Sequence, residues 1–231
     1  MAIRDNLAQI EERLRAACRR AGRSWETVRI MGVSKFHPAA KLDEAWDAGL
    51  RLFGESRVQE AAVKFAGFKD GHPGTELHMI GSLQRNKVKT AVPLFDCVES
   101  VDREELIAEL GILSADRDRP LPILLELNSG EASKSGFPDE DSLFRAAEKV
   151  LAYPGIISRG LMTMAPLTDD PVRIRAAFRA LAHAAAALEQ RFPGADWSCL
   201  SMGMSGDFEI AVEEGSTVIR IGTAIFGERE G

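Results

Sequence analysis

The strongest constraint on the fold of this chain is a pattern that recurs along its whole length: a short apolar run, a loop rich in Gly, Ser or Asn, and an amphipathic helical segment. Strands that alternate with helices pair in parallel, because each helix carries the chain back to the edge where the last strand began. The eight runs expected to be strands are residues 28–33, 51–53, 76–80, 94–98, 121–127, 156–161, 197–200 and 217–221.

The number of repeats favours one parallel architecture over another. Eight units are typical of a closed (β/α)8 barrel of the TIM type, and a doubly wound open sheet is the second choice. Residues 5–21 add a leading helix, because apolar residues recur at helical spacing from Leu7 to Leu14 and Gly22 supplies a stop. No linker interrupts the series. We therefore predict an α/β fold with a single barrel domain over residues 1–231 and an extra N-terminal helix.

Composition and charge exclude several classes of function. The formal net charge of -6 argues against nucleic-acid binding, because a duplex binder needs a basic face to displace counterions from the phosphates. No apolar run has membrane-spanning length, and the N-terminus lacks the apolar centre of a signal peptide. Cys18, Cys97 and Cys199 have no C-x-x-C spacing and suit a reducing compartment. We expect a cytoplasmic monomer, since nothing in the sequence requires a membrane or a partner chain.

A lysine follows the first expected strand. Residues 30–33 show no polar alternation, which is typical of a strand buried on both faces, and Pro38 then opens a helix. Lys35 therefore lies at the carboxyl end of a buried strand, where parallel α/β folds place their chemistry. It is a candidate for forming a Schiff base or for binding an anion. The alternative is a lysine that merely extends its ammonium group into water.

Small residues follow the last two expected strands. The loops at 201–207 and 220–224 place Ser201, Gly203, Gly222 and Thr223 ahead of helices, where backbone N–H groups bind phosphate well. In the alternative interpretation, Ser205 only caps a helix and the glycines only make turns.

A phosphate site and a strand-end lysine at one mouth indicate pyridoxal 5'-phosphate (PLP), a phosphorylated aldehyde. The lysine must be neutral to attack the aldehyde, and burial can lower a lysine pKa by up to ~3–5 units. Arg220 would then face the pyridine nitrogen, disfavour its protonation and suppress carbanion chemistry. The alternative for Arg220 is an ion pair with an acid inside the barrel.

The ordered motifs of the chain resemble those of the pyridoxal phosphate homeostasis proteins over nearly its whole length. The motifs are Val33-Ser34-Lys35, Phe53-Gly54-Glu55 with Val58-Gln59-Glu60, His78 to Gln84 with Asn86-Lys87, residues 133–136, Gly160-Leu161-Met162, Leu200 to Ser205 and Arg220 to Gly227. The resemblance implies a barrel similar to the N-terminal domain of alanine racemases.

The resemblance also implies roles for individual residues. Lys35 is the Schiff-base lysine, Ser201, Gly222 and Thr223 contact the phosphate, and Arg220 lies near the pyridine nitrogen. The expected cofactor-binding set also contains Met79, Met202 and Ser56. The family usually has Asn in place of Ser56. Such a protein would buffer PLP or deliver it transiently to PLP-dependent apoenzymes, and a part for Lys134 in that transfer is left open.

Three classes of function compete: a non-catalytic PLP carrier, a PLP-dependent racemase or decarboxylase, and a Schiff-base aldolase. A racemase of this barrel type resembles a two-base enzyme that uses a tyrosine from a further domain, and the one tyrosine here, Tyr153, is expected at the closed end of the barrel. An aldolase would use carboxylates such as Glu55 and Glu126 beside the lysine. We expect a carrier and not an enzyme.

Two other features are interpreted as packing. His78 lies in an expected strand, and we predict a hydrogen-bonded core histidine, not a metal ligand or a base. The methionines at 162, 164, 202 and 204 are interpreted as adaptable core packing and not as a sulfur-ligand site.

Overall fold

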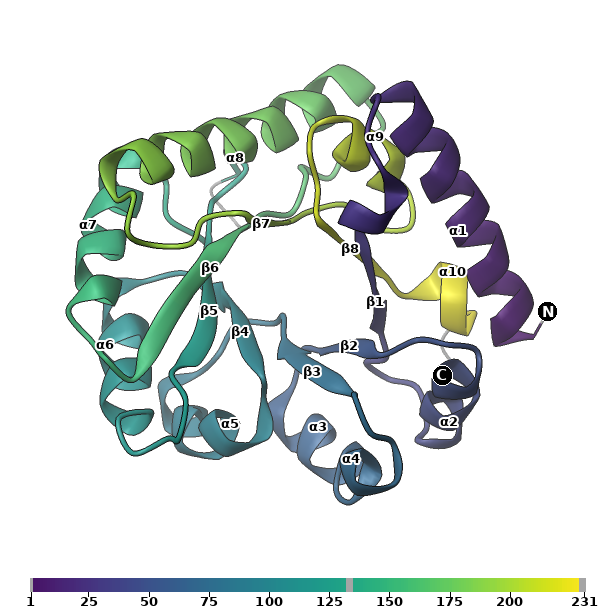
Figure 1. Ribbon diagram of the computed structural model, residues 1–231, viewed down its shortest axis with the longest axis horizontal. Coiled ribbons are helices and arrows are strands. Elements are labelled where there is room, and N and C mark those ends of the chain that lie inside the picture. Colours follow the sequence, from purple (N-terminus) through teal and green to yellow (C-terminus); the bar gives the residue numbers. More distant parts are fainter. Residues whose placement is uncertain (1, 132–134, 229–231) are drawn as a thin grey trace.

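The computed structural model describes residues 2–131 and 135–228. Within these residues, eight parallel strands pair in sequence order and close into a barrel through the pairing of the last strand with the first (Figure 1). The strands are β1 (Arg29–Val33), β2 (Leu52–Glu55), β3 (Glu76–Met79), β4 (Cys97–Val101), β5 (Leu121–Glu126), β6 (Ile156–Met162), β7 (Cys199–Ser201) and β8 (Val218–Ile221). The predicted barrel is confirmed.

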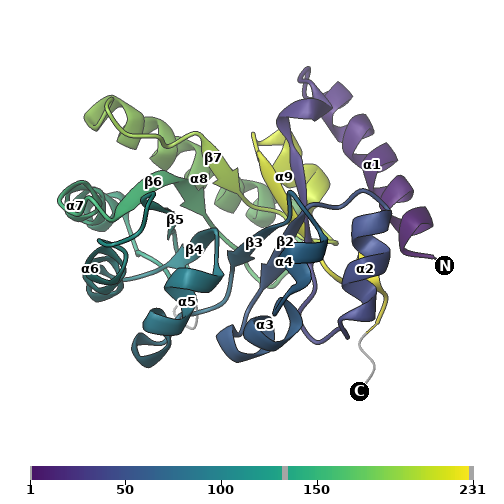
Figure 2. The same ribbon diagram turned by 60° about the horizontal axis from the view of Figure 1, so that its bottom comes forward.

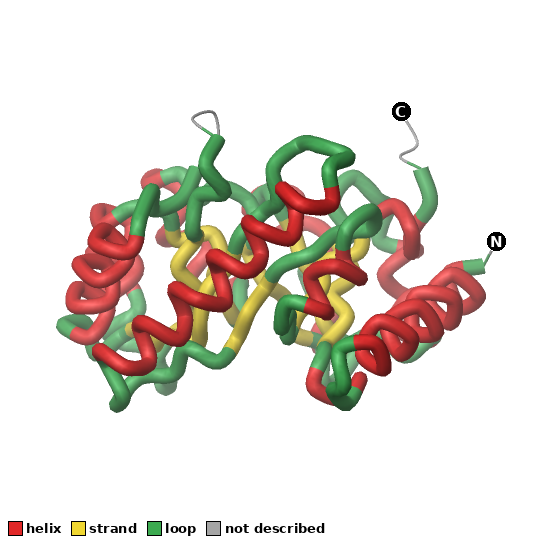
Figure 3. Tube along the Cα trace, turned by 90° about the horizontal axis from the view of Figure 1, so that it is seen from above, coloured by secondary structure: helices red, strands yellow, loops and turns green. Residues whose placement is uncertain are grey.

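The helices lie outside the ring of strands (Figures 1 and 3). They are α1 (Ile3–Arg20), η1 (Trp25–Thr27), α2 (Ala40–Asp47), α3 (Val58–Lys64), α4 (Phe68–Gly71), η2 (Arg85–Lys87), α5 (Val88–Leu94), α6 (Glu104–Leu113), α7 (Glu140–Leu151), α8 (Pro171–Arg191), α9 (Phe208–Glu213) and α10 (Thr223–Phe226). In the part of the chain that the structure describes, no helix is long and apolar enough to cross a membrane.

The predicted N-terminal helix is α1, and it lies at the outer edge of the molecule in Figures 1 and 2. Its buried stripe includes Leu7 and Leu14 and packs against α9 and α10. The Asn6 side-chain amide donates to the Ile225 carbonyl at 2.9 Å. The helix therefore supports α10, the short helix that follows the last strand.

One predicted strand was misplaced by three residues. The run 94–98 was expected to be a strand, but β4 is Cys97–Val101, and Leu94 ends α5. The Phe95 N–H closes the helix by donating to the Ala91 carbonyl at 3.0 Å. The apolar residues before the strand thus belong to a helix end that packs on the barrel. The shift brings Glu99 into the strand.

The barrel interior holds both apolar and ionic side chains. Successive side chains of a strand alternate between the interior and the surrounding helices. Two small interior clusters are apolar, one with Met31, Leu52 and Val218 and the other with Cys97, Leu124 and Met162. Between these clusters, hydrogen bonds join β3, β4, β7 and β8 across the barrel. The interior therefore contains a polar network, whereas the main hydrophobic core lies between sheet and helices.

Candidate functional site

Lys35 lies where the sequence predicts it, in the turn that follows β1. Ser34 to His37 form a turn that is closed by the His37 N–H donating to the Ser34 carbonyl at 3.1 Å. Lys35 is half-buried in this turn, and Phe36, next to it, has φ 67°. The lysine therefore stands at the carboxyl end of the barrel on a turn of unusual backbone conformation.

The start of α10 lies beside the strand that carries Lys35. Strand β8 pairs with β1, and a Cβ atom added to Gly222 would lie 3.5 Å from the Val33 carbonyl oxygen. The ring of Phe226 stacks on the ring of His37, with 5.2 Å between centroids. The Thr223 N–H makes no hydrogen bond within the described residues. Gly222 and Thr223 thus lie next to the Lys35 turn in the folded chain.

The loop after β7 brings a second backbone donor. Ser201 and Met202 are buried, and the Met202 N–H donates to the Val218 carbonyl at 3.1 Å. Gly203 has φ 97°, and an added Cβ would lie 2.6 Å from the Ala211 Cβ, so only glycine fits. Its N–H makes no hydrogen bond in the described part of the chain. Ser205 does not cap α9, whose N-cap is Asp207.

Arg220 is buried inside the barrel and held by three hydrogen bonds. Its guanidinium donates to the Ser201 carbonyl at 2.6 Å, to the Ser201 hydroxyl at 2.8 Å and to the Thr163 carbonyl at 2.8 Å. Desolvation lowers the pKa of Arg220, and the charge of Glu99 opposes that shift. A guanidinium stays protonated in proteins. Arg220 therefore supplies a fixed positive charge with donors left over.

The Ser201 hydroxyl links Arg220 to an acid that the sequence reasoning missed. It accepts from Arg220 and donates to Glu99 at 2.5 Å. A hydroxyl has a single proton to donate. The predicted contact from Ser201 to a phosphate remains a prediction, and through the side chain it would require the hydroxyl to leave Glu99. The alternative interpretation of Arg220 was an ion pair with an acid inside the barrel; within the described residues, the Ser201 hydroxyl joins the guanidinium to Glu99 and no direct pair forms.

His78 is a hydrogen-bonded core histidine, as predicted. Its Nδ1 lies 2.7 Å from Glu99 Oε1, and its Nε2 lies 3.6 Å from Glu76 Oε2. Burial acts to lower the pKa of His78, but the bonds to the two acids raise it overall. Glu76, Glu99 and His78 line a cavity of about 870 Å³, together with Arg29 at the start of β1. The polar network thus runs from Arg220 to the amino ends of the strands.

Ser56 and Met79 form a neighbouring group on β2 and β3. Glu55 is paired with Met79 in the sheet, and both Ser56 and Met79 line a cavity of about 330 Å³ together with Lys87. Met79 is 1% exposed and packs in the main core. The predicted cofactor-binding residues therefore fall into two sets, one on β1, β7 and β8 and one on β2 and β3, and β1 pairs with β2. Lys134 lies outside the described residues.

The residues named for rival functions lie in different places. Glu126 is 2% exposed at the end of β5, where burial raises its pKa and the Ser135 hydroxyl donates to it at 2.9 Å. Glu55 is the last residue of β2, where it is fully buried and contacts Ser34 and Lys64. Tyr153 precedes β6 and packs on Gly111 of α6. Its place at the amino end of the barrel agrees with the prediction.

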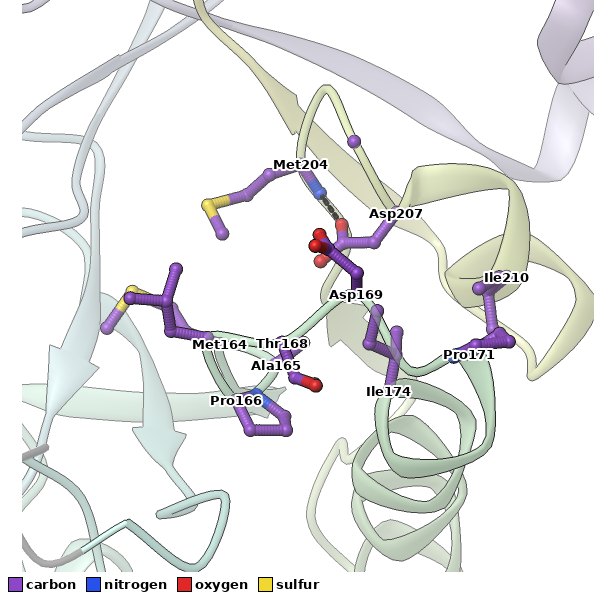
Figure 4. Close-up of a pocket in the computed structure, with 12 residues that line it drawn as sticks. Met164, Ala165, Pro166, Thr168, Asp169, Pro171, Ile174, Met204, Asp207 and Ile210 are labelled. Carbon is purple, nitrogen blue, oxygen red and sulfur yellow. Dashed lines mark hydrogen bonds between the residues drawn. The ribbon is translucent and has the colours of Figure 1, made fainter.

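The four methionines divide between the core and a cavity beside the site. Met162 and Met202 are buried core residues. Met164 and Met204 line a cavity of about 570 Å³ between the loops after β6 and β7, and Figure 4 shows their side chains on the same side of it. The Met204 N–H donates to Asp207 Oδ1 at 2.5 Å and fixes the second loop. Among the described residues no group of His, Cys, Asp and Glu could hold a metal ion.

Comparison with known proteins identifies the family. The profile of the alanine racemase N-terminal domain family matches residues 6–230. The pyridoxal phosphate homeostasis protein of Vibrio cholerae serotype O1 is 41% identical over 232 residues, which cover 99% of this chain and 97% of that protein. This chain belongs to the pyridoxal phosphate homeostasis protein family. The resemblance predicted from the motifs is confirmed.

Solved structures agree with this family. PipY of Synechococcus elongatus without PLP superposes with a TM-score of 0.88 at 36% identity, covering 97% of this chain and 100% of that chain. A structure of PipY with PLP bound gives a TM-score of 0.85 at 35% identity with the same coverage. Alanine racemase from Bacillus anthracis has a TM-score of 0.73 at 16% identity, and this chain covers 56% of it. That more distant likeness shows the barrel fold alone.

Proposed function

We propose that this member of the pyridoxal phosphate homeostasis protein family binds PLP at the carboxyl end of its barrel, as a Schiff base on Lys35. The observation that carries the proposal is that the Lys35 turn lies beside Gly222, whose added Cβ would be only 3.5 Å from the Val33 carbonyl. A structure of the related PipY has PLP bound, which supports binding of this cofactor.

The residues present fit the cofactor. Gly203 and Thr223 have backbone N–H groups without a partner among the described residues, and both follow strands that end at the mouth. Such donors are what a phosphate requires. Gly222 has no side chain to block the approach of an anion. The proposal also assigns Met202, Ser56 and Met79 to the cofactor-binding site.

The binding step needs a neutral Lys35 amine. Its nitrogen adds to the aldehyde carbon, and the aldehyde oxygen leaves as water with both amine hydrogens. When bound, PLP can act as an electron sink for carbanion chemistry. Arg220 opposes that use, because a fixed guanidinium disfavours a proton on a facing ring nitrogen. This chain would therefore hold PLP without using it catalytically.

We infer a role in buffering PLP or handing it transiently to PLP-dependent apoenzymes, by a monomer in the cytoplasm. Two features support binding over catalysis: Arg220 is a fixed cation held by backbone and hydroxyl acceptors, and Tyr153 packs against α6. A racemase-like activity is the second candidate. The buried Glu126, with its raised pKa, favours it as a potential acid near the mouth.

The test is spectroscopic. Purified protein mixed with PLP is expected to turn yellow, and borohydride should bleach it and leave the label on Lys35, as read by mass spectrometry of peptides. Lys35→Ala should fold and stay colourless. Stoichiometric, borohydride-reducible PLP in Lys35→Ala would contradict the assignment.

A further inference from the structure

A second lysine, Lys64, lies behind the turn that carries Lys35. It ends α3, and its side chain is only 9% exposed. Its Nζ donates to the Ser34 carbonyl at 2.6 Å and to the His37 carbonyl at 3.3 Å. One ammonium group thus holds the backbone on both sides of Lys35.

Two acids complete this arrangement. Lys64 Nζ lies 2.5 Å from Glu55 Oε1 and 2.9 Å from Glu60 Oε1. Glu55 also accepts from the Ser34 hydroxyl at 2.7 Å, and Glu60 accepts from the Phe36 N–H at 2.5 Å. The residues on either side of Lys35 are therefore both tied to the pair of acids that Lys64 holds.

The backbone of the turn needs such support. Phe36 has φ 67°, a left-handed conformation that is uncommon for a bulky residue and strains the backbone. It persists only where the surroundings fix it. Glu60 holds its N–H, and the Arg57 guanidinium lies 5.0 Å from the centroid of its ring. These contacts come from the segment between β2 and the end of α3.

The charges in the cluster depend on Lys64. Burial raises the pKa of Glu55, and the hydrogen bonds from Lys64 and Ser34 limit the rise. Burial also acts to raise the pKa of Glu60, but the bonds from Lys64 and the Phe36 N–H lower it overall. Without Lys64, two neighbouring carboxylates would face each other, and the buried one would have no cation.

We propose that Lys64 is a positioning residue for the attachment of PLP: it holds the Ser34–His37 turn so that the Lys35 amine meets the aldehyde carbon. This inference rests on the proposed function. Lys64 does not itself react, because its ammonium group is bound by two acids and two carbonyls. The attachment bond forms at Lys35, and water leaves as described above.

The test compares Lys64→Met and Lys64→Arg with the wild type and with Lys69→Met. Lys69 is a matched control, since it is 33% exposed and lies 2.6 Å from Asp96, away from the turn. Two quantities are measured: the rate at which absorbance of the attached cofactor appears after PLP is added, and amide hydrogen exchange over residues 34–37 in cofactor-free protein. We expect Lys64→Met to slow attachment roughly 10- to 100-fold, because a small misplacement of a reacting group has that effect.

Several outcomes decide the matter. Faster exchange in the turn, slow attachment and recovery in Lys64→Arg support the inference. The inference is overturned if the attachment rate and the amide exchange in Lys64→Met equal those in Lys69→Met.

If Lys64→Met does not fold, Glu60→Gln gives the same test, because it weakens the acceptor of the Phe36 N–H. If wild-type protein takes up PLP without a label on Lys35, the proposed function fails at that point. The exchange of the turn in cofactor-free protein still decides whether Lys64 holds it.

Discussion

The Nδ1 atom of His78 lies 2.7 Å from Oε1 of Glu99 inside the barrel, where the two side chains are 11% and 0% exposed. Glu99 has a lowered pKa although burial acts to raise it, because His78 and Arg220 supply positive charge and His78 and Ser201 donate hydrogen bonds. The buried Glu99 carboxylate is thus the counter-charge for both His78 and Arg220, which lie on different strands.

The His78 network predicts a pH dependence of stability. The pKa of His78 is raised above its usual 6.5. Its contribution to the free energy of unfolding is therefore complete below pH 6.5 and is lost as pH rises through the raised pKa. The pKa of Glu76 is lowered from 4.5 to about 2, chiefly by its bond to His78, so its contribution is lost as pH falls toward 2. Wild type should therefore exceed His78→Gln in melting temperature most clearly between about 4.5 and 6.5.

Melting curves by circular dichroism from acid to alkaline pH check this. His183→Gln is the control, because its side chain is 77% exposed beside Glu140. A difference between wild type and His78→Gln that stays constant across the pH range would refute the role of this pair.

Glu99→Gln should destabilise the fold. It leaves Arg220 and the His78 cation buried without their shared counter-charge, and removal of one partner of a buried pair costs about 3–5 kcal/mol. For a domain of this size that corresponds to a fall in melting temperature of roughly 6–20 °C. Glu148→Gln, from an exposed pair with Arg191, should change stability by less than about 1 kcal/mol. Equal melting temperatures for the two variants would count against the network.

Gly222→Ala should weaken binding of PLP far more than binding of unphosphorylated pyridoxal. The protein has room for the added methyl, since its nearest neighbours are Val33 atoms at 3.5 Å or more. A loss of PLP affinity would therefore show that the added methyl group blocks the approach of the phosphate. Loss of one charged hydrogen bond is worth about 1.5–3 kcal/mol, or roughly 10- to 100-fold in affinity. Titration of both ligands, with Gly194→Ala as a surface control, measures it. Equal losses for both ligands would show that no phosphate binds there.

The holo-protein should bind PLP without turning over amino acids. Tyr153 packs on Gly111 at the amino end of the barrel, and Arg220 holds a fixed charge in the interior. A positioned acid or base contributes typically ~10²–10⁴-fold to a reaction rate, and Tyr153 lies at the wrong end of the barrel for that role. NMR of alanine and serine in heavy water measures exchange of the Cα proton. Exchange at enzymatic rates that disappears in Lys35→Ala would establish an enzyme, with Glu126 as the first residue to test.

The sequence by itself determined the barrel and the position of Lys35, because both depend on local patterns. The repeated strand and helix periods require parallel pairing, and a lysine two residues past a buried strand must lie at its carboxyl end. Gly222 was also predictable, since it follows the last strand directly.

Tertiary structure alone decided which polar groups meet inside the barrel and behind the turn. Glu99 and Ser201 are 102 residues apart, and the misplaced boundary of β4 hid the side of the strand that Glu99 faces. Lys64 reads in the sequence as an ordinary helix end, and only the packing of α3 against the β1 turn brings its ammonium group to the Ser34 carbonyl. Long-range contacts of this kind depend on the register of strands and on side-chain direction, which a shift of one residue reverses.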